Sequence, residues 1–148
     1  MLIQTTRFGE IECKDEELLT FTNGIPGFKE YLKYFLIVID DSPFIYLQSV
    51  EEKSLAFIVV SPFDFFPDYE FELPELVEQE MDVKRTTDIK ILNIISVNGD
   101  LTTATLNLAA PLIINLANRT GMQYIISDEK YSIRQPLFAD SLIVEGSR

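Results

Sequence analysis

The sequence predicts a single all-β domain, a small antiparallel barrel or sandwich that carries one short helix. Apolar and polar residues alternate with a period of two along most of the chain, which is the pattern of half-buried strands. The alternating runs recur at intervals of roughly 8–12 residues with Gly, Pro, Asn and Asp between them, as in sandwiches and barrels. We expect residues 1–140 to form this domain and residues 141–148 to be a disordered or cloning-derived tail.

Short strands are expected wherever the alternation holds. The ranges are Leu2–Thr6, Phe8–Cys13, Leu18–Thr22, Tyr34–Asp40, Phe44–Ser49, Leu55–Val60, Tyr69–Leu73, Ile89–Val97, Leu101–Leu108, Leu112–Leu116 and Met122–Ser127. The run Ile89–Val97 is too apolar to face water on one side, so we place it in the middle of the sheet. The next run alternates cleanly, with Ala104 and Leu106 on one face and threonines on the other.

Turn and capping residues mark two hairpins and one helix. Asn98-Gly99 between two apolar runs is the strongest short-range hairpin signal, because both residue types tolerate positive φ. Asn118–Gly121 is expected to form the loop of a second hairpin. In Pro74–Met81, Pro stands at a first helical position, acids fill the first turn, and apolar residues such as Leu76 and Val77 recur at helical spacing. One short helix is therefore expected there.

The composition favours a folded binding protein over an enzyme. The chain has 24 acidic and 12 basic residues, a formal net charge of −12, and is 47% hydrophobic. The apolar content excludes disorder, and the charge disfavours nucleic acid, which small β-barrels often bind. The absence of His rules out Ser–His and Cys–His catalysis. Cys13 shares an apolar face with Ile11 and is expected to be a small buried hydrophobe.

No motif points to a cofactor, a metal or a membrane. The sequence contains no Gly-rich phosphate loop, no calcium-type Asp loop and no Cys/His cluster. It shows no signal peptide and no membrane-length apolar run, so we expect a cytoplasmic protein without a membrane partner. The alternative is a carboxylate-dependent hydrolase on a small β-barrel, although Asp40-Asp41 and Glu51-Glu52 flank expected turns, where solvated charge is usual.

The acidic residues are concentrated in one part of the chain. Between Asp64 and Asp82 lie eight acids and no Lys or Arg. In a strand, Asp68, Glu70 and Glu72 would lie on one face roughly 7 Å apart. Two neighbouring phenylalanines cannot both point inward from an extended segment. A solvated edge strand with one Phe closing a barrel end explains this pattern as well as a contact patch for a basic partner does. The hypothesis of a contact patch comprises Asp64, Phe65, Phe66, Asp68, Glu70 and Glu72.

A series of short motifs carries a family resemblance. In order they are Gly24-Ile25-Pro26-Gly27-Phe28, Leu47–Glu51, Ala56–Val59, Ser61-Pro62-Phe63, Asn107–Asn115, Gly121-Met122-Gln123, Tyr131 and Arg134–Leu137. With this order and spacing, the chain closely resembles the FliW family of bacterial flagellar assembly factors over residues 1 to about 138. Each motif alone is weak, and their combination is specific.

The resemblance implies a small β-barrel-like protein that is not an enzyme. Members of this family bind flagellin and the translational repressor CsrA. Flagellin and CsrA compete for the same limited protein, so their relative amounts decide which complex forms, as a partner switch governed by mass action. An acidic protein suits CsrA, because an RNA-binding surface is positive. Flagellin is expected to be held by apolar surface or by strand addition at an exposed edge.

Other residues of the motifs are expected to have structural roles. Pro26 and the flanking Gly24 and Gly27 are expected to form a turn. Pro111 marks a strand start or a bulge, and Asn107 and Asn115 are expected to satisfy backbone groups near it.

Overall fold

The structure is a computed structural model that describes residues 1–127 and 129–138. The tail expected over residues 141–148 and the last two residues of the expected domain lie outside this part. The strands are β1 (Leu2–Thr5), β2 (Gly9–Glu12), β3 (Leu19–Thr20), β4 (Lys33–Val38), β5 (Ile45–Ser49), β6 (Ala56–Val60), β7 (Ile89–Asn98), β8 (Asp100–Leu106), β9 (Leu112–Asn115), β10 (Thr120–Gln123) and β11 (Gln135–Pro136). The helical segments are α1 (Glu75–Glu80) and the 3-10 turns η1 (Asp15–Glu17), η2 (Pro62–Asp64) and η3 (Thr86–Asp88). This confirms an all-β fold with one short α-helix.

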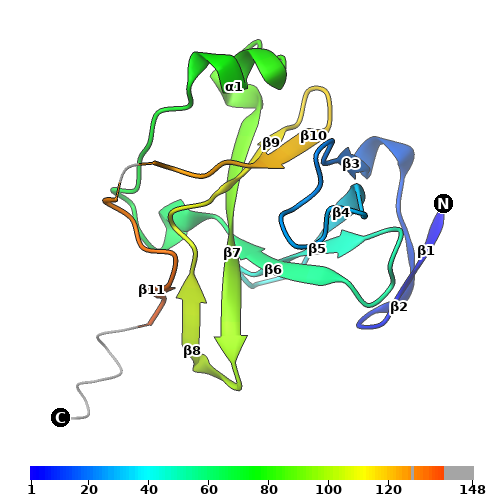
Figure 1. Ribbon diagram of the computed structural model, residues 1–148. Coiled ribbons are helices and arrows are strands. Elements are labelled where there is room, and N and C mark those ends of the chain that lie inside the picture. Colours follow the sequence, from blue (N-terminus) through cyan, green and yellow to red (C-terminus); the bar gives the residue numbers. More distant parts are fainter. Residues whose placement is uncertain (128, 139–148) are drawn as a thin grey trace.

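Seven strands close into a barrel. The sheet runs β11-β8-β7-β6-β5-β4-β3-β10-β9, and β9 pairs again with β7, so the strands from β7 round to β9 form a ring. All of these pairings are antiparallel except the short contact of β10 with β3. Figure 1 shows α1 at one end of the barrel beside β7 and β9, while the other end of β7 projects with β8. Closure of the ring removes the free edges that an open sheet would present.

Strand β7 is central, as the sequence predicts. Ile89–Leu92 pairs with β9, Asn93–Ile95 with β6, and Ile95–Asn98 with β8. One end of this long strand is thus part of the barrel, and its other end forms a two-stranded extension with β8. The apolar run is explained because both faces of this strand are covered over most of its length.

The core has three parts. The barrel interior is filled by Leu19, Phe21, Ile25, Tyr34, Leu47, Val59, Leu92, Leu112 and Ile114. A second cluster lies under β7 and β8 and consists of Val60, Tyr69, Ile95, Ala104, Leu106, Leu108 and Leu137. Ile3, Cys13 and Phe35 form the third, between the β1–β2 hairpin and β4. The second cluster is the one that supports the acidic part of the chain.

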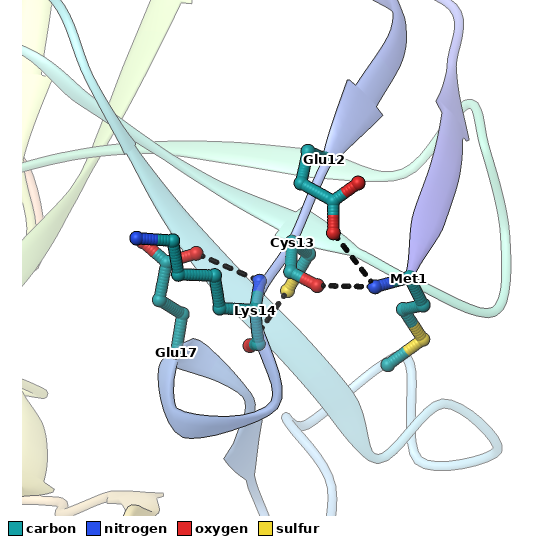
Figure 2. A network of polar contacts seen from close by, with 5 residues as sticks. All are labelled: Met1, Glu12, Cys13, Lys14 and Glu17. Atoms are coloured by element: carbon teal, nitrogen blue, oxygen red, sulfur yellow. Dashed lines mark hydrogen bonds and ion pairs between the residues drawn. The ribbon is translucent and has the colours of Figure 1, made fainter.

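The β1–β2 hairpin is fastened to the chain that follows it (Figure 2). The ammonium of Met1 donates to Glu12 Oε2 at 2.9 Å and to the carbonyl oxygen of Cys13 at 2.8 Å, and the hydrogen bond to Glu12 raises the pKa of this ammonium. The backbone N–H of Lys14 donates to Glu17 Oε1 at 2.9 Å, which starts η1. Cys13 is 0% exposed, as predicted, and burial raises the pKa of its thiol.

Both predicted hairpins exist, with corrected turns. In the β7–β8 hairpin only Gly99 has a positive φ, +87°, and the register shifts between Ser96 and Asn98. The β9–β10 loop occupies residues 116–119, two residues earlier than predicted, with Arg119 at φ 59°. The loop starts earlier because β10 already pairs with β9 from Thr120.

At the acidic part of the chain the predicted strand is wrong and the predicted helix is confirmed. Tyr69–Leu73 is not a strand, because no neighbouring strand pairs with it. Its side chains nevertheless alternate between buried and exposed, as the sequence pattern indicates. The helix is present at Glu75–Glu80, but Leu76 is 78% exposed and Val77 only partly buried. A helix this short has no complete apolar face to bury.

Candidate protein-binding site

The acidic segment, residues 64–82, runs along one side of the molecule. It leaves η2, passes through a turn, extends over residues 69–73 and ends in α1 (Figure 1, green). The four carboxylates of the predicted patch, Asp64, Asp68, Glu70 and Glu72, are all exposed. Among the described residues none of the four takes part in a salt bridge. These four carboxylates therefore present negative charge to solvent without a salt bridge in the described part of the chain.

The two phenylalanines of the predicted patch lie underneath it. Phe65 and Phe66 are partly buried and pack against the second core cluster. The expectation that one of the two rings points outward is wrong, because it requires an extended chain and the chain is coiled here. Instead their backbone N–H groups both donate to the carbonyl oxygen of Pro62, at 3.1 and 2.7 Å, and the coiled chain turns both rings inward. Phe63, which the prediction passed over, is the exposed ring at 44%.

Two tyrosines fix the extended stretch onto the barrel. Tyr69 is 4% exposed, its hydroxyl donates to the carbonyl oxygen of Leu108 at 2.7 Å, and burial raises its pKa. The hydroxyl of Tyr131 donates to the carbonyl oxygen of Glu70 at 2.8 Å and accepts the N–H of the same residue at 3.0 Å. The two tyrosine rings meet edge to face, with centroids 4.7 Å apart. Residue 70 is thereby held in place by both of its backbone groups.

A hollow of about 540 Å³ opens between the extended stretch and the chain that follows β10. We call it the acidic hollow; its lining residues are Glu70, Phe71, Glu72, Tyr124, Ile126, Ser127, Lys130 and Tyr131. The rings of Phe71 and Tyr124 stack with centroids 6.1 Å apart. Lys130 Nζ lies 5.2 Å from the centroid of the Tyr131 ring, a cation–π contact. The hollow therefore combines aromatic walls with two carboxylates.

A second hollow, of about 480 Å³, lies on the other side of the same stretch beneath α1. It shares Glu70 and Phe71 with the first one, and we call it the apolar hollow. The rest of its lining is Phe63, Tyr69, Leu73, Glu78, Val83, Thr86, Ile89, Ile91 and Ile113. Apolar side chains form most of its lining, and Glu70 and Glu78 are its acids.

The asparagines of the motifs hold the parts of the chain that frame these hollows. Asn115 Nδ2 donates to the carbonyl oxygen of Met81 at 3.0 Å, which ties the end of α1 to β9, and its Oδ1 accepts the N–H of Ala117. Asn107 Oδ1 accepts the N–H of Ala109 at 3.1 Å. Pro111 precedes the first residue of β9 and accepts the N–H of Tyr124 at 2.9 Å. Asn107 and Asn115 Oδ1 thus bind nearby backbone groups, as the sequence indicates, whereas the contact of Asn115 with Met81 joins residues 34 positions apart.

The glycines of the first motif form a tight turn away from the hollows. The N–H of Phe28 donates to the carbonyl oxygen of Ile25 at 2.7 Å across Pro26-Gly27, and Gly27 has φ +91°. Pro followed by a residue of positive φ is the pattern of a type II turn. A Cβ on Gly24 would come within 2.6 Å of Lys29 Cα, so no larger residue fits there.

The chemistry of the hollows favours binding over catalysis. Glu70 and Glu72 both line the acidic hollow, but they project from the same side of a single segment and are both exposed. A hydrolytic carboxylate pair needs two acids that flank the bond to be broken, one of them in apolar surroundings. Over residues 1–127 and 129–138 no three His, Cys, Asp or Glu side chains are grouped to hold a metal ion. In the same part of the chain no helix has the length and apolar character needed to cross a membrane.

Sequence reasoning gave no role to Tyr131, Tyr124 or Phe63. Tyr131 stood only in the motif series, and its contact with Glu70 joins residues 61 positions apart. Tyr124 lies in the predicted strand Met122–Ser127, but β10 ends at Gln123. An aromatic residue near the end of a strand carries no signal of such distant contacts, so only the fold reveals them.

The fold and the site define a small closed β-barrel with an acidic, aromatic-lined surface. The family model described as FliW protein matches residues 2–137. This chain belongs to the FliW family. The flagellar assembly factor FliW of Caldicellulosiruptor saccharolyticus is 39% identical over 137 residues, 93% of this chain and 90% of the relative. The Bacillus subtilis protein of the same name is 37% identical over 142 residues, 95% and 99% of the two chains. A crystal structure of the flagellar assembly factor FliW matches with a TM-score of 0.89 at 33% identity, covering 96% of this chain and 100% of its own.

Proposed function

We propose that this chain is a flagellar assembly factor that works in the cytoplasm by binding proteins. Its partners are the translational repressor CsrA and flagellin, and it has no enzymatic activity. The observation that carries the proposal is the match to the FliW family over nearly the whole described domain, with relatives that are named flagellar assembly factors. Among rival functions, nothing favours catalysis on this surface.

The acidic segment is the proposed contact for CsrA. It holds eight acids and no base, and the carboxylates of the patch are exposed. A protein that binds RNA needs a positive surface, so the two surfaces are complementary. Complementary charge mainly accelerates encounter and selects the partner, and salt weakens it. Phe65 and Phe66 support this surface from below, and Phe63 is the ring that a partner can reach.

The apolar hollow beneath α1 is the proposed contact for flagellin. Flagellin exposes apolar terminal segments before it is assembled, and most of the lining of this hollow is apolar. Both hollows share Glu70 and Phe71, so a flagellin that fills one also meets the CsrA surface. Competition would then follow from mass action: flagellin that accumulates captures the assembly factor and releases CsrA.

Calorimetric titration with CsrA tests the proposal. The wild-type chain is expected to bind, and binding is expected to weaken as salt rises. The double variant Glu70→Lys and Glu72→Lys is expected to bind at least about tenfold more weakly, because two attractive charges become repulsive. The matched control, Glu16→Lys with Asp40→Lys, changes net charge equally at exposed acids outside the segment and is expected to retain affinity.

Three results would contradict the proposal. A wild-type chain that binds neither CsrA nor flagellin would remove the function itself. Equal affinity of the two double variants would remove the acidic segment as the contact. Simultaneous binding of CsrA and flagellin, seen as a ternary complex in sedimentation, would remove the competition.

A further inference from the structure

The extended stretch at residues 69–73 resembles a strand that lacks a neighbour. Its side chains alternate between the core and solvent, with Tyr69 inside and Glu70 and Glu72 outside. No hydrogen bond in the described part of the chain involves the backbone N–H or carbonyl of residues 71, 72 or 73. Unpaired backbone groups in an extended conformation are what an incoming strand requires.

The edge of this stretch that faces the acidic hollow is occupied at Glu70 and open at Glu72. The N–H and the carbonyl of Glu70 both meet the hydroxyl of Tyr131, which lines that hollow. Alternate residues of an extended chain direct their backbone groups to the same edge, so those of Glu72 point to the hollow as well. They have no partner there among residues 1–127 and 129–138.

The opposite wall of the hollow offers a second open edge. Residues 124–127 follow β10 without forming a strand. The N–H of Tyr124 donates to Pro111 and that of Ile126 to Ala109, so these residues are bonded on the side away from the hollow. Ile125, between them, has no backbone hydrogen bond in the described part of the chain and is 62% exposed. A segment placed between the two walls meets free backbone groups on both sides.

We infer that the acidic hollow is a strand-addition site for an extended protein segment with Lys or Arg at alternate positions. This inference deepens the proposed function, on which it rests, by specifying how a protein partner is held. Main-chain hydrogen bonds to Glu72 and Ile125 supply the pairing, and side chains supply the selectivity.

The charge of the hollow selects the occupant. Residues opposite one another on neighbouring strands lie on the same face, so side chains across from Glu70 and Glu72 meet carboxylates. Lys130 already lies over the Tyr131 ring, which shows that this wall accepts a cation. The chain's own residues 139–148 contain two acids and one base, and a second copy of the chain carries a net charge of −12. A basic partner segment is therefore the best match.

The test uses the full-length protein, labelled with ¹⁵N and titrated with a short synthetic peptide of alternating Lys and Val. Amide shifts are expected at Phe71, Glu72 and Ile125. A peptide with Glu in place of Lys is expected not to bind. A third peptide, N-methylated at every residue so that neither of its edges offers an N–H group, is expected to bind about tenfold more weakly.

Two protein variants separate charge from backbone. The double variant Glu70→Gln and Glu72→Gln is expected to bind the Lys/Val peptide about three- to tenfold more weakly, because it loses two cross-strand charge pairs. Glu72→Pro removes the backbone donor as well and is expected to weaken binding further. The control, Glu16→Gln with Asp40→Gln, is expected to bind as the wild type does. If the proline variant fails to fold, as judged by its amide spectrum, the N-methylated peptide decides.

Each contrary result has a distinct meaning. Equal binding of the N-methylated peptide would overturn strand addition, as would amide shifts confined to other surfaces. If the peptide binds only after residues 139–148 are deleted, the occupant of the acidic hollow is the chain's own tail and the inference is overturned. If the wild type dimerises and Glu72→Pro abolishes the dimer, the occupant is a second copy of the chain, which overturns the inference as well. If CsrA and flagellin bind these variants at wild-type affinity, this inference is overturned and the proposed function stands. If the wild-type chain binds the peptide but binds neither CsrA nor flagellin, the proposed function is overturned and the strand-addition site stands.

Discussion

Replacement of Tyr34 by Phe is expected to stabilise the protein at pH 7. The side chain lies in the barrel interior, is 0% exposed, and packs edge to face against Phe21 with centroids 5.4 Å apart. Its hydroxyl has no hydrogen-bond partner in the part of the chain that the structure describes. A buried polar group without a partner costs about 1–3 kcal/mol, and the Phe ring fills nearly the same volume. We therefore expect the free energy of unfolding to rise by about 1 kcal/mol.

The same substitution is expected to flatten the loss of stability at alkaline pH. Burial, aided by the charges of Glu51 and Glu30, raises the pKa of Tyr34 to about 12. In the unfolded chain a tyrosine titrates near pH 10. Below about pH 10 both states keep the proton; from there to about pH 12 only the unfolded state releases it, so the wild type loses up to roughly 1.4 kcal/mol per pH unit. The Phe variant lacks this contribution.

Urea unfolding followed by far-ultraviolet circular dichroism measures both effects, at pH 7 and at steps from pH 9 to 12. The matched control is Tyr46→Phe, a partly exposed tyrosine on β5, which is expected to change stability by less than about 0.5 kcal/mol at pH 7. A destabilised Tyr34→Phe protein at pH 7 would show that the hydroxyl is paired in solution. Parallel pH profiles of wild type and variant would refute the argument from burial.

Three further substitutions test the contacts that shape the site. Asn115→Ala is expected to cost about 2–3 kcal/mol in urea unfolding, because the buried amide donates to the carbonyl oxygen of Met81. Tyr131→Phe keeps the ring but removes both hydrogen bonds to the acidic segment, so hydrogen exchange at the N–H of residue 70 is expected to accelerate about tenfold. Gly121→Ala places a Cβ 2.6 Å from Cζ of the buried Phe21 and is expected to lower the free energy of unfolding by about 1–3 kcal/mol, measured by thermal unfolding.

Each of these predictions has a result that would contradict it. An Asn115→Ala protein of wild-type stability would mean that α1 is held by other contacts. Unchanged exchange at residue 70 in Tyr131→Phe would mean that the hydroxyl does not hold the segment. Wild-type stability of Gly121→Ala would mean that the barrel interior has room next to this position.

The sequence predicts the burial of individual residues better than it predicts which strands are neighbours in the sheet. The period of two places Cys13 in the core, the nearly continuous apolar run places Ile89–Val97 in the middle of the sheet, and both predictions are confirmed. These features depend on one strand alone, since alternation reports the faces of that strand. Closure of the barrel depends on β7 pairing with β9 in one half and β8 in the other. No periodicity encodes that division, because each segment of the chain has the same pattern whichever strand lies beside it.

The same limit explains what sequence reasoning found at the candidate site. The carboxylates were placed correctly on the exposed face, because charge and alternation agree there. The phenylalanines were misplaced, because η2 begins at Pro62 and its turn changes the direction of each following side chain. Pro62 itself was visible in the sequence as a signal of a turn. The length of that turn, which decides that both rings face the core, depends on packing against the second core cluster.

The failed strand prediction at residues 69–73 follows from the closed barrel. Strand β7 pairs with β9, β6 and β8 in turn along its length, and the ring of strands from β7 to β9 is closed. A segment with the alternation of a strand is therefore excluded from the sheet and lies across the second core cluster, held there by side chains. Because its side chains alternate, the segment buries one face as a strand does. Its backbone groups at residues 71–73, however, have no hydrogen-bond partner in the described part of the chain. An acidic segment in this position resists pairing with another acidic chain and accepts a basic one, because like charges on opposite residues repel.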